Sequence, residues 1–273
     1  MPLIEQIASY WDRVPCGSRH INPTEQRYFT QPHIRAFADF RHWKGKRVLE
    51  IGCGIGTDTV EFLRAGVRSI SAVDISSESL AIAAKRSYDY SRSTGARPCA
   101  WFCPANAEEF LPAGIFDLIY SFGVLHHTPH PEKVLALAHD KLAEDGELRI
   151  MLYAKWSWKH LFTGQQPEAQ AGCPLVRWYS MREARGLVES CGFEVVSIEK
   201  RHIFPWKISK YIERKYARAF PWNIVPEYWL EPYLGHHLLI QARRSLKTPT
   251  ITPASGVTPC SATGSTKLGA AHG

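Results

Sequence analysis

Between Lys46 and Tyr153 the sequence alternates short apolar runs with longer stretches of helical periodicity. The runs are rich in Val, Ile, Leu and aromatic residues and are almost continuously apolar at their centres, which is typical of strands buried on both faces. This alternation predicts an α/β fold, a Rossmann-like, doubly wound, seven-stranded, mostly parallel sheet with helices on both faces. The predicted core strands are Arg47–Ile51, Ser69–Ile75, Cys99–Cys103, Phe116–Phe122 and Glu147–Tyr153, and the helices between them are Thr57–Ala65, Ser77–Ser91 and Pro131–Ala143.

Further elements are expected on both sides of this core. Asp145-Gly146 predicts a turn just before the fifth core strand. The predicted flanking elements are two leading helices at Pro2–Trp11 and Pro32–Phe40 joined by a polar stretch, a later helix at Ser180–Cys191, and two strands at Phe193–Glu199 and His236–Ala242.

A length of 273 residues suits one decorated domain. We expect this domain to span residues 1–245, with N-terminal helices in 1–45, a ligand-binding core in 46–153, and caps at about 156–179 and 204–234. Residues 246–273 are dominated by Ser, Thr, Pro, Gly and Ala and contain no aromatic residue, so a disordered tail is predicted there.

Composition excludes several classes of protein. A hydrophobic fraction of 45% rules out wholesale disorder, and no apolar run approaches the roughly 18 residues that cross a bilayer. The first residues carry Glu5 and Asp12 and lack the apolar centre of a secretory signal. Seven scattered cysteines are most simply reduced thiols, so we expect a cytoplasmic location and no metal site.

The net charge of +7 is concentrated late in the chain. Residues 1–199 carry 22 basic and 23 acidic side chains, whereas residues 200–244 carry nine basic and three acidic ones. The basic character therefore describes an added segment and gives no reason to expect a nucleic-acid partner for the core.

The glycine-rich turn after the first core strand is the strongest functional signal. Residues 48–57 read VLEIGCGIGT, so a buried strand runs straight into Gly52, Gly54 and Gly56 and then into a helix. Glycines let a backbone approach a ligand closely, and the helix N-terminus offers free N–H groups.

Two further residues indicate which ligand binds there. Asp74 ends the second strand, where a carboxylate can accept hydrogen bonds from ribose hydroxyls. A dinucleotide site expects G-x-G-x-x-G/A, but the third small position here holds Thr57, and Glu50 would repel a pyrophosphate. A nucleoside with a positive end and no phosphate fits better.

On these motifs the sequence resembles the class I S-adenosylmethionine-dependent methyltransferases. The resemblance covers about Lys46 to Tyr153 in five stretches that follow in the expected order. These are VLEIGCGIGT (48–57), AVDIS (72–76), ANAEEFLP (105–112), FDLIYSFGVLHH (116–127) and KLAEDGELRIMLY (141–153).

The resemblance implies roles for individual residues and S-adenosylmethionine as cofactor. Gly52, Gly54 and Gly56 would line its methionine part, with Glu50 near the amino end. Asp74 would bind the ribose, Ile75 would pack on the adenine, and Asn106 and Ala107 would face the adenine edge, although the family often has Asp at the position of Asn106. Ser121 and Phe122 would border the reacting methyl group.

The histidines and the aromatic residues near the N-terminus leave alternatives open. His126 and His127 follow the fourth strand, and a general base there, preferably His126, competes with simple loop packing. Tyr10, Trp11 and Tyr28 either close over the cofactor or pack against the sheet.

Residues 204–234 form a basic, aromatic-rich segment with several possible roles. Residues 207–220 have the pattern of an amphipathic basic helix. The segment is interpreted, in decreasing order of preference, as a lid over a small substrate, a plain cover of the sheet, a membrane-surface contact or a nucleic-acid face.

The sequence thus predicts a methyltransferase that acts on a small molecule, with a role in secondary metabolite biosynthesis suggested by the family alone. The alternatives are a lipid or quinone methyltransferase at a membrane surface and a cofactor-binding module without catalysis. The acceptor atom and the oligomeric state are not predicted.

Overall fold

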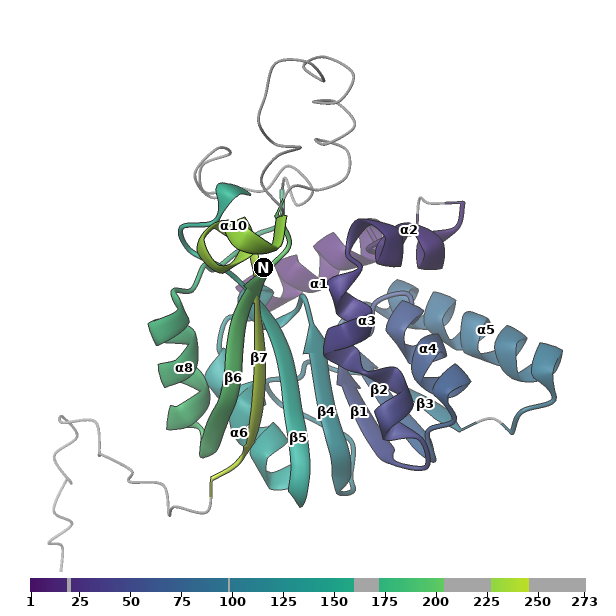
Figure 1. Ribbon diagram of the computed structural model, residues 1–273. Coiled ribbons are helices and arrows are strands. Elements are labelled where there is room, and N and C mark those ends of the chain that lie inside the picture. The colour runs from purple at the N-terminus through teal and green to yellow at the C-terminus, as the bar shows by residue number, and fades with distance from the viewer. Residues whose placement is uncertain (19–20, 98, 160–171, 204–226, 246–273) are drawn as a thin grey trace, which may run out of the picture.

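The computed structural model describes residues 1–18, 21–97, 99–159, 172–203 and 227–245 (Figure 1). The predicted tail, the centre of the first cap and the predicted helix at 207–220 therefore lie outside the described residues. Among the helices in the described ranges, none is both long and apolar enough to cross a membrane.

One seven-stranded sheet organises the chain, in the order β3-β2-β1-β4-β5-β7-β6. Strands β1 to β5 pair in parallel, and β7 is antiparallel to both β5 and β6. The predicted Rossmann-like, mostly parallel α/β fold is confirmed. The strands are β1 (Arg47–Ile51), β2 (Ser69–Asp74), β3 (Ala100–Pro104), β4 (Phe116–Phe122), β5 (Leu142–Tyr153), β6 (Phe193–Arg201) and β7 (His237–Arg244).

Helices cover the two faces of this sheet (Figure 1). The helices are α1 (Leu3–Arg13), α2 (Pro23–Thr30), α3 (His33–Ala38), η1 (Phe40–Trp43), α4 (Thr57–Ala65), α5 (Ser77–Thr94), η2 (Leu125–His127), α6 (Pro131–Lys141), α8 (Met181–Ser190) and α10 (Glu227–Leu234).

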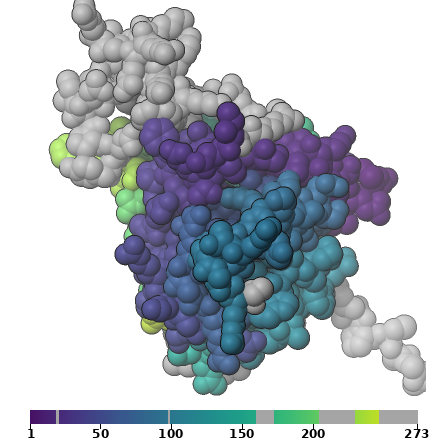
Figure 2. All heavy atoms as spheres, turned by 90° about the vertical axis from the view of Figure 1, so that its right-hand side faces the viewer, coloured from purple at the N-terminus to yellow at the C-terminus, as the bar shows by residue number. Residues whose placement is uncertain are grey.

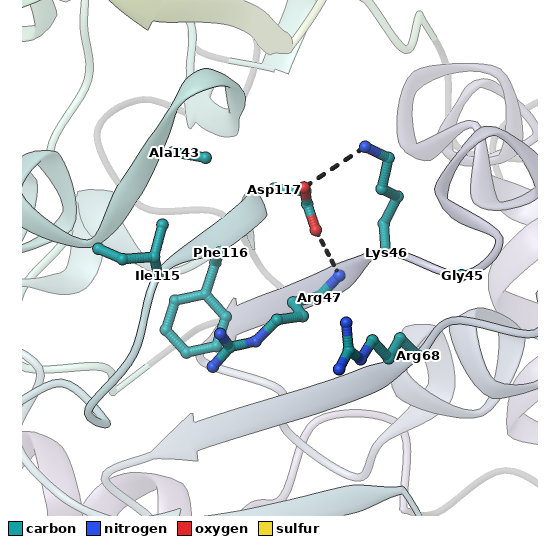
Figure 3. Close-up of a pocket in the computed structure, with 8 residues that line it drawn as sticks. All are labelled: Gly45, Lys46, Arg47, Arg68, Ile115, Phe116, Asp117 and Ala143. Carbon is teal, nitrogen blue, oxygen red and sulfur yellow. Dashed lines mark hydrogen bonds and ion pairs between the residues drawn. The ribbon is translucent and has the colours of Figure 1, made fainter.

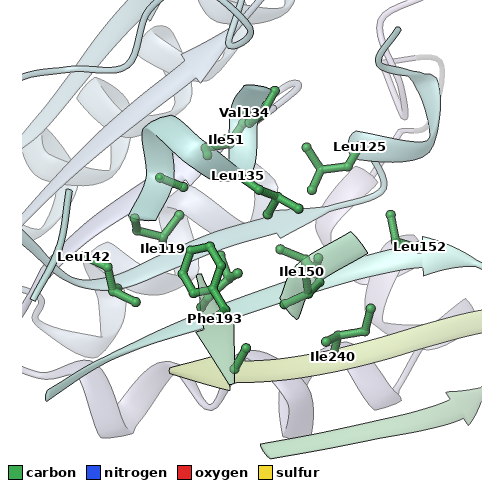
Figure 4. Close-up of a cluster of buried hydrophobic side chains, with 14 of the residues drawn as sticks. Ile51, Ile119, Leu125, Val134, Leu135, Leu142, Ile150, Leu152, Phe193 and Ile240 are labelled. Carbon is green, nitrogen blue, oxygen red and sulfur yellow. The ribbon is translucent and has the colours of Figure 1, made fainter. Parts of the chain in front are cut away.

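The side chains of each strand contribute alternately to two separate hydrophobic cores, because successive residues of a strand point to opposite faces of the sheet. Leu49, Ile119 and Ile150 pack with α6 and α8 on one face (Figure 4). Val48 and Leu118 pack with α3, η1 and α4 on the other face.

The predicted bounds of β1, β4 and α4 agree with the structure, but two elements differ from expectation. The supposedly polar linker contains α2, whose N-cap Asn22 accepts a hydrogen bond from the Glu25 N–H at 3.2 Å. The turn predicted at Asp145-Gly146 is wrong: β5 begins at Leu142 and runs through it. The pairing with β4 is irregular there: Phe116 faces Leu142 and Leu118 faces Glu147, so residues 143–146 of β5 have no partner on β4.

The N-terminal helices lie across the edge of the sheet where the parallel strands end. Figure 2 shows this segment, in purple, above the blue elements α4 and α5. The Asp12 carboxylate accepts hydrogen bonds from the Ser76 hydroxyl at 2.8 Å and the Glu78 N–H at 3.3 Å, which ties α1 to the start of α5.

A buried carboxylate joins α2 to the core. Asp58, in the first turn of α4, accepts a bidentate ion pair from Arg27 at 3.0 and 2.7 Å and hydroxyl hydrogen bonds from Tyr28 and Tyr120 at 2.7 and 2.9 Å. Arg27 and these hydrogen bonds lower the pKa of Asp58 despite its burial. The carboxylate is therefore ionised and fully paired, which is what a buried charge requires.

Asp58→Ala is expected to lower the free energy of unfolding by about 3–5 kcal/mol, because it leaves the Arg27 charge without its partner. Urea unfolding at neutral pH measures this loss. Asp140→Ala is the matched control, since that side chain is 80% exposed. A loss at Asp58 no larger than at Asp140 would contradict the structural role of this network.

Candidate functional site

The candidate site lies where the strand order reverses. The chain runs outward from β1 to β2 and β3 and then returns to β4 on the other side of β1. The carboxyl ends of β1 and β4 meet at this reversal, which is where open α/β sheets bind their ligands.

The three glycines of the turn after β1 have different surroundings. A Cβ on Gly52 would lie 2.1 Å from the Val124 side chain, and one on Gly56 would lie 2.7 Å from the Cβ of Ala83. A Cβ on Gly54, in contrast, would meet nothing within 4 Å, and its φ is +53°. The outer glycines thus permit close packing of η2 and α5, while Gly54 leaves its face of the turn open to a ligand.

Asp74, at the end of β2, is held against this turn. Its carboxylate accepts a hydrogen bond from the Gly54 N–H at 2.7 Å and one from the Ser76 N–H at 2.9 Å. Burial raises the pKa of the Asp74 carboxyl, and the two N–H groups act in the opposite direction. This hydrogen bond therefore joins Asp74 to Gly54, although the two residues are twenty positions apart in the sequence.

Glu50 lies beneath the turn, near the end of β1. It is 3% exposed, and its carboxyl group accepts a hydrogen bond from the Thr59 hydroxyl at 2.5 Å. Burial, followed by the negative charge of Asp58, raises the pKa of Glu50 to about 8. A positive group nearby would favour its ionised form.

The loop after β3 approaches Asp74 from the other side. The Ala105 N–H donates to the Asp74 backbone carbonyl at 3.0 Å, which brings Asn106 and Ala107 near the site. The Asn106 side chain is occupied locally: its Oδ1 accepts from the Glu108 N–H at 3.1 Å, and its Nδ2 donates to Glu109 at 3.0 Å. Ile75 is half-buried at the end of β2.

Ser121 and Phe122 are the last residues of β4 and lie next to the end of β1. The Ser121 hydroxyl donates to the backbone carbonyl of Ile51 at 3.0 Å, which fixes the end of β4 to the end of β1. Phe122 is 9% exposed, and the Arg27 guanidinium lies 5.1 Å from its ring centroid.

His126 and His127 are buried in η2, next to Tyr153. The His126 ring stacks on Tyr153 at 3.7 Å, and neither of its ring nitrogens has a hydrogen-bond partner among the described residues. Burial lowers the pKa of His126 well below its usual value and that of His127 to about 4. Both imidazoles are therefore neutral at physiological pH.

Arg86 stabilises the site but carried no signal in the sequence, unlike the aromatic residues near the N-terminus. The Arg86 guanidinium donates to the Ile55 carbonyl at 2.8 Å, to Thr57 at 2.9 Å and to Thr24 at 2.7 Å, and so joins α5 to the glycine turn and α2. Trp11 meets His127 edge-to-face at 5.3 Å, whereas Tyr28 packs in the core.

These surroundings fit S-adenosylmethionine. The open face of Gly54 permits close approach, and the Asp74 carboxylate beside it can accept ribose hydroxyls. The Asp74 carboxylate, and Glu50 once a positive group favours its ionised form, would repel phosphates but attract an ammonium or a sulfonium. Within the described residues, no three His, Cys, Asp or Glu side chains are placed to hold a metal ion.

A second hollow lies at the opposite edge of the sheet (Figure 3). Asp117 there accepts hydrogen bonds from the Arg47 N–H at 2.7 Å and the Lys46 ammonium at 3.5 Å. Because it lies at the amino ends of β1 and β4, it is separated from the glycine turn by the length of the strands.

Comparison with known proteins identifies the family. A family model described as a methyltransferase domain matches residues 21–198, more than half of the chain. A tRNA U34 carboxymethyltransferase of Shewanella sp. is 30% identical over 138 residues, which are 50% of this chain and 34% of that protein. The chain spans only about a quarter to a third of the length of such curated relatives.

Solved structures share the fold at lower identity. The [4+2]-cyclase SpnF superimposes with a TM-score of 0.61 at 20% identity, covering 90% of this chain and 98% of that one. The magnesium protoporphyrin IX methyltransferase of Synechocystis PCC 6803, with bound S-adenosylhomocysteine, superimposes with a TM-score of 0.60 at 13% identity, covering 89% and 100%. With the family match, the chain belongs to the class I S-adenosylmethionine-dependent methyltransferases.

Proposed function

We propose that this methyltransferase transfers the methyl group to a small-molecule acceptor at the carboxyl edge of β4 and β5. The supporting observation is the wall of buried rings at that edge. Phe122, His126, His127 and Tyr153 are each 9% exposed or less. A wall of rings suits a compact, flat acceptor better than an extended polymer.

The site residues receive the following proposed roles. Gly52, Gly54 and Gly56 line the methionine part of the cofactor, and Glu50 lies near its amino end. Asp74 binds the ribose, and Ile75, Asn106 and Ala107 surround the adenine. The local hydrogen bonds of Asn106 leave this residue to act through its position and backbone more than through its side-chain oxygen.

S-adenosylmethionine supplies an electrophilic methyl group on a good leaving group. The residues of the chain therefore need only to align the acceptor and exclude water. Ser121 and Phe122 border the methyl position and fix the wall beside it. His126, our proposed proton acceptor, is a weak base because burial lowers its pKa, so it suits an acceptor whose proton is already acidic.

The wider assignments remain part of the proposal: a domain of residues 1–245 with caps at 156–179 and 204–234, a cytoplasmic location, and a role in secondary metabolite biosynthesis. The rival membrane-surface function depends on residues 207–220, outside the described ranges. The tRNA relatives share about a third of their length with this chain.

The function is tested by following the release of S-adenosylhomocysteine with separate acceptor classes: small acids, phenols and amines, total tRNA, and anionic vesicles. We expect turnover with at least one small-molecule class and none with tRNA or vesicles. Turnover confined to tRNA or vesicles contradicts the proposal. Tight cofactor binding without any turnover favours the non-catalytic module.

The buried Glu50 should make the stability of the protein depend on pH. Its folded-state pKa of about 8 lies above the ordinary 4.5, so the folded state binds the extra proton between these values. Stability without cofactor should therefore fall as the pH rises from about 5 to about 8.5, by a few kcal/mol at about 1.4 kcal/mol per pKa unit.

Glu50→Gln should flatten this pH dependence, because the amide cannot ionise. Urea unfolding across the same pH range measures it, with the exposed Glu144→Gln as the matched control. Equal pH slopes in the wild-type protein and in Glu50→Gln would show that Glu50 ionises as an ordinary carboxyl group.

A further inference from the structure

Three histidines from distant parts of the chain meet beside Phe122. His33 begins α3, His202 follows β6, and His237 begins β7. The His33 Nε2 lies 2.9 Å from the His237 Nδ1, and the His202 ring stacks on His237 with centroids 4.5 Å apart. Because β6 ends and β7 begins at the edge where β4 ends, this histidine cluster (His33, His202 and His237) borders the proposed acceptor site.

The cluster has hydrogen-bonding capacity to spare. A neutral imidazole carries one N–H donor, and the bond between His33 and His237 uses one such donor whichever ring supplies it. When His237 is the donor in this bond, the two remaining N–H groups lie on His33 and His202, and neither has a partner among the described hydrogen bonds. His33 and His202 are only partly buried, so a ligand can reach them.

The charged surroundings of the cluster are basic. Arg27 and Arg201 act on His33, and Lys159 acts on His202 and His237; each of these charges lowers an imidazole pKa. Burial is the largest cause of the low pKa of both groups, about 3 for His33 and about 4 for His202, and for His33 the neighbouring His202 precedes the arginines.

The acidic groups nearby are already paired. Glu231 accepts hydrogen bonds from the Arg201 guanidinium and the His202 N–H, both at 3.0 Å, and Asp58 pairs with Arg27. Further polar or aromatic neighbours include His236, 5.2 Å from the His237 ring, Tyr153, whose ring stacks on His237 at 6.0 Å, and Trp158, whose Nε1 donates to the His202 carbonyl at 3.2 Å. The cluster is thus neutral and rich in donors, and the basic groups that act on it are the two paired arginines and Lys159.

We propose that the histidine cluster forms a wall of the acceptor site and that His33 and His202 donate hydrogen bonds to an ionised oxygen of the acceptor, a carboxylate or an acidic phenol. This inference rests on the proposed function and names the class of its substrate. Spare N–H donors beside basic side chains favour an anion, and the rings of Phe122 and Tyr153 favour one attached to an aromatic or other flat group.

The test uses protein saturated with S-adenosylhomocysteine and two probes of nearly the same shape, benzoate and benzamide. Calorimetry should show benzoate binding at least about tenfold more tightly than neutral benzamide. His33→Phe and His202→Phe keep a ring but remove the N–H groups, and each should weaken benzoate binding about tenfold without changing the affinity for S-adenosylhomocysteine.

His130→Phe is the control, because His130 is 53% exposed and pairs with Glu132 on the protein surface. The inference is overturned if the two probes bind equally, if neither binds, or if both cluster variants bind benzoate like the wild-type protein. Failure of the wild-type protein to bind S-adenosylhomocysteine overturns the proposed function itself, which separates the two cases.

Discussion

The close packing of two helices on one backbone turn is the constraint on which the site depends. The Val124 side chain lies where a Cβ of Gly52 would be, and Ala83 lies where a Cβ of Gly56 would be. These contacts bring η2 and α5 against the end of β1, while Gly54 between them stays open. The positions of Asp74, Ser76 and the histidines of η2 all follow from this packing, because each belongs to an element that the turn holds.

The two halves of the carboxyl edge have opposite electrostatic character. Around the glycine turn, Glu50 and Asp74 provide carboxyl groups, whereas Arg201 and Lys159 act on the histidine cluster. Arg27 stands between the halves, since it pairs with Asp58 and also lies over Phe122. A cationic methyl donor and an anionic acceptor would each find a complementary half, and the acceptor would meet the donor at Ser121 and Phe122.

Elements whose local sequence pattern agrees with the fold could be predicted from the sequence. Buried parallel strands are continuously apolar, so β1 and β4 were predicted with the bounds that the structure shows, and the glycine turn was predicted from its spacing. The elements and contacts that depend on strand register or on residues far apart in the sequence could not be predicted. Asp145-Gly146 has the composition of a turn, but it lies within β5, in a stretch where residues 143–146 have no partner on β4. Nothing local connects Arg27 with Tyr120, or His33 with His237, because only the folded sheet brings these pairs together.

The central claim is that the open face of Gly54 receives the cofactor, and a pair of glycine variants tests it most directly. Gly45 resembles Gly54, with a φ of +73° and nothing within 4 Å of a Cβ, but it lies at the amino end of β1. Alanine at either position should cost about 1–2 kcal/mol of stability from the left-handed backbone. Calorimetric titration with S-adenosylhomocysteine should show at least about a tenfold loss of affinity for Gly54→Ala and none for Gly45→Ala. Equal affinities in the two variants would contradict the claim.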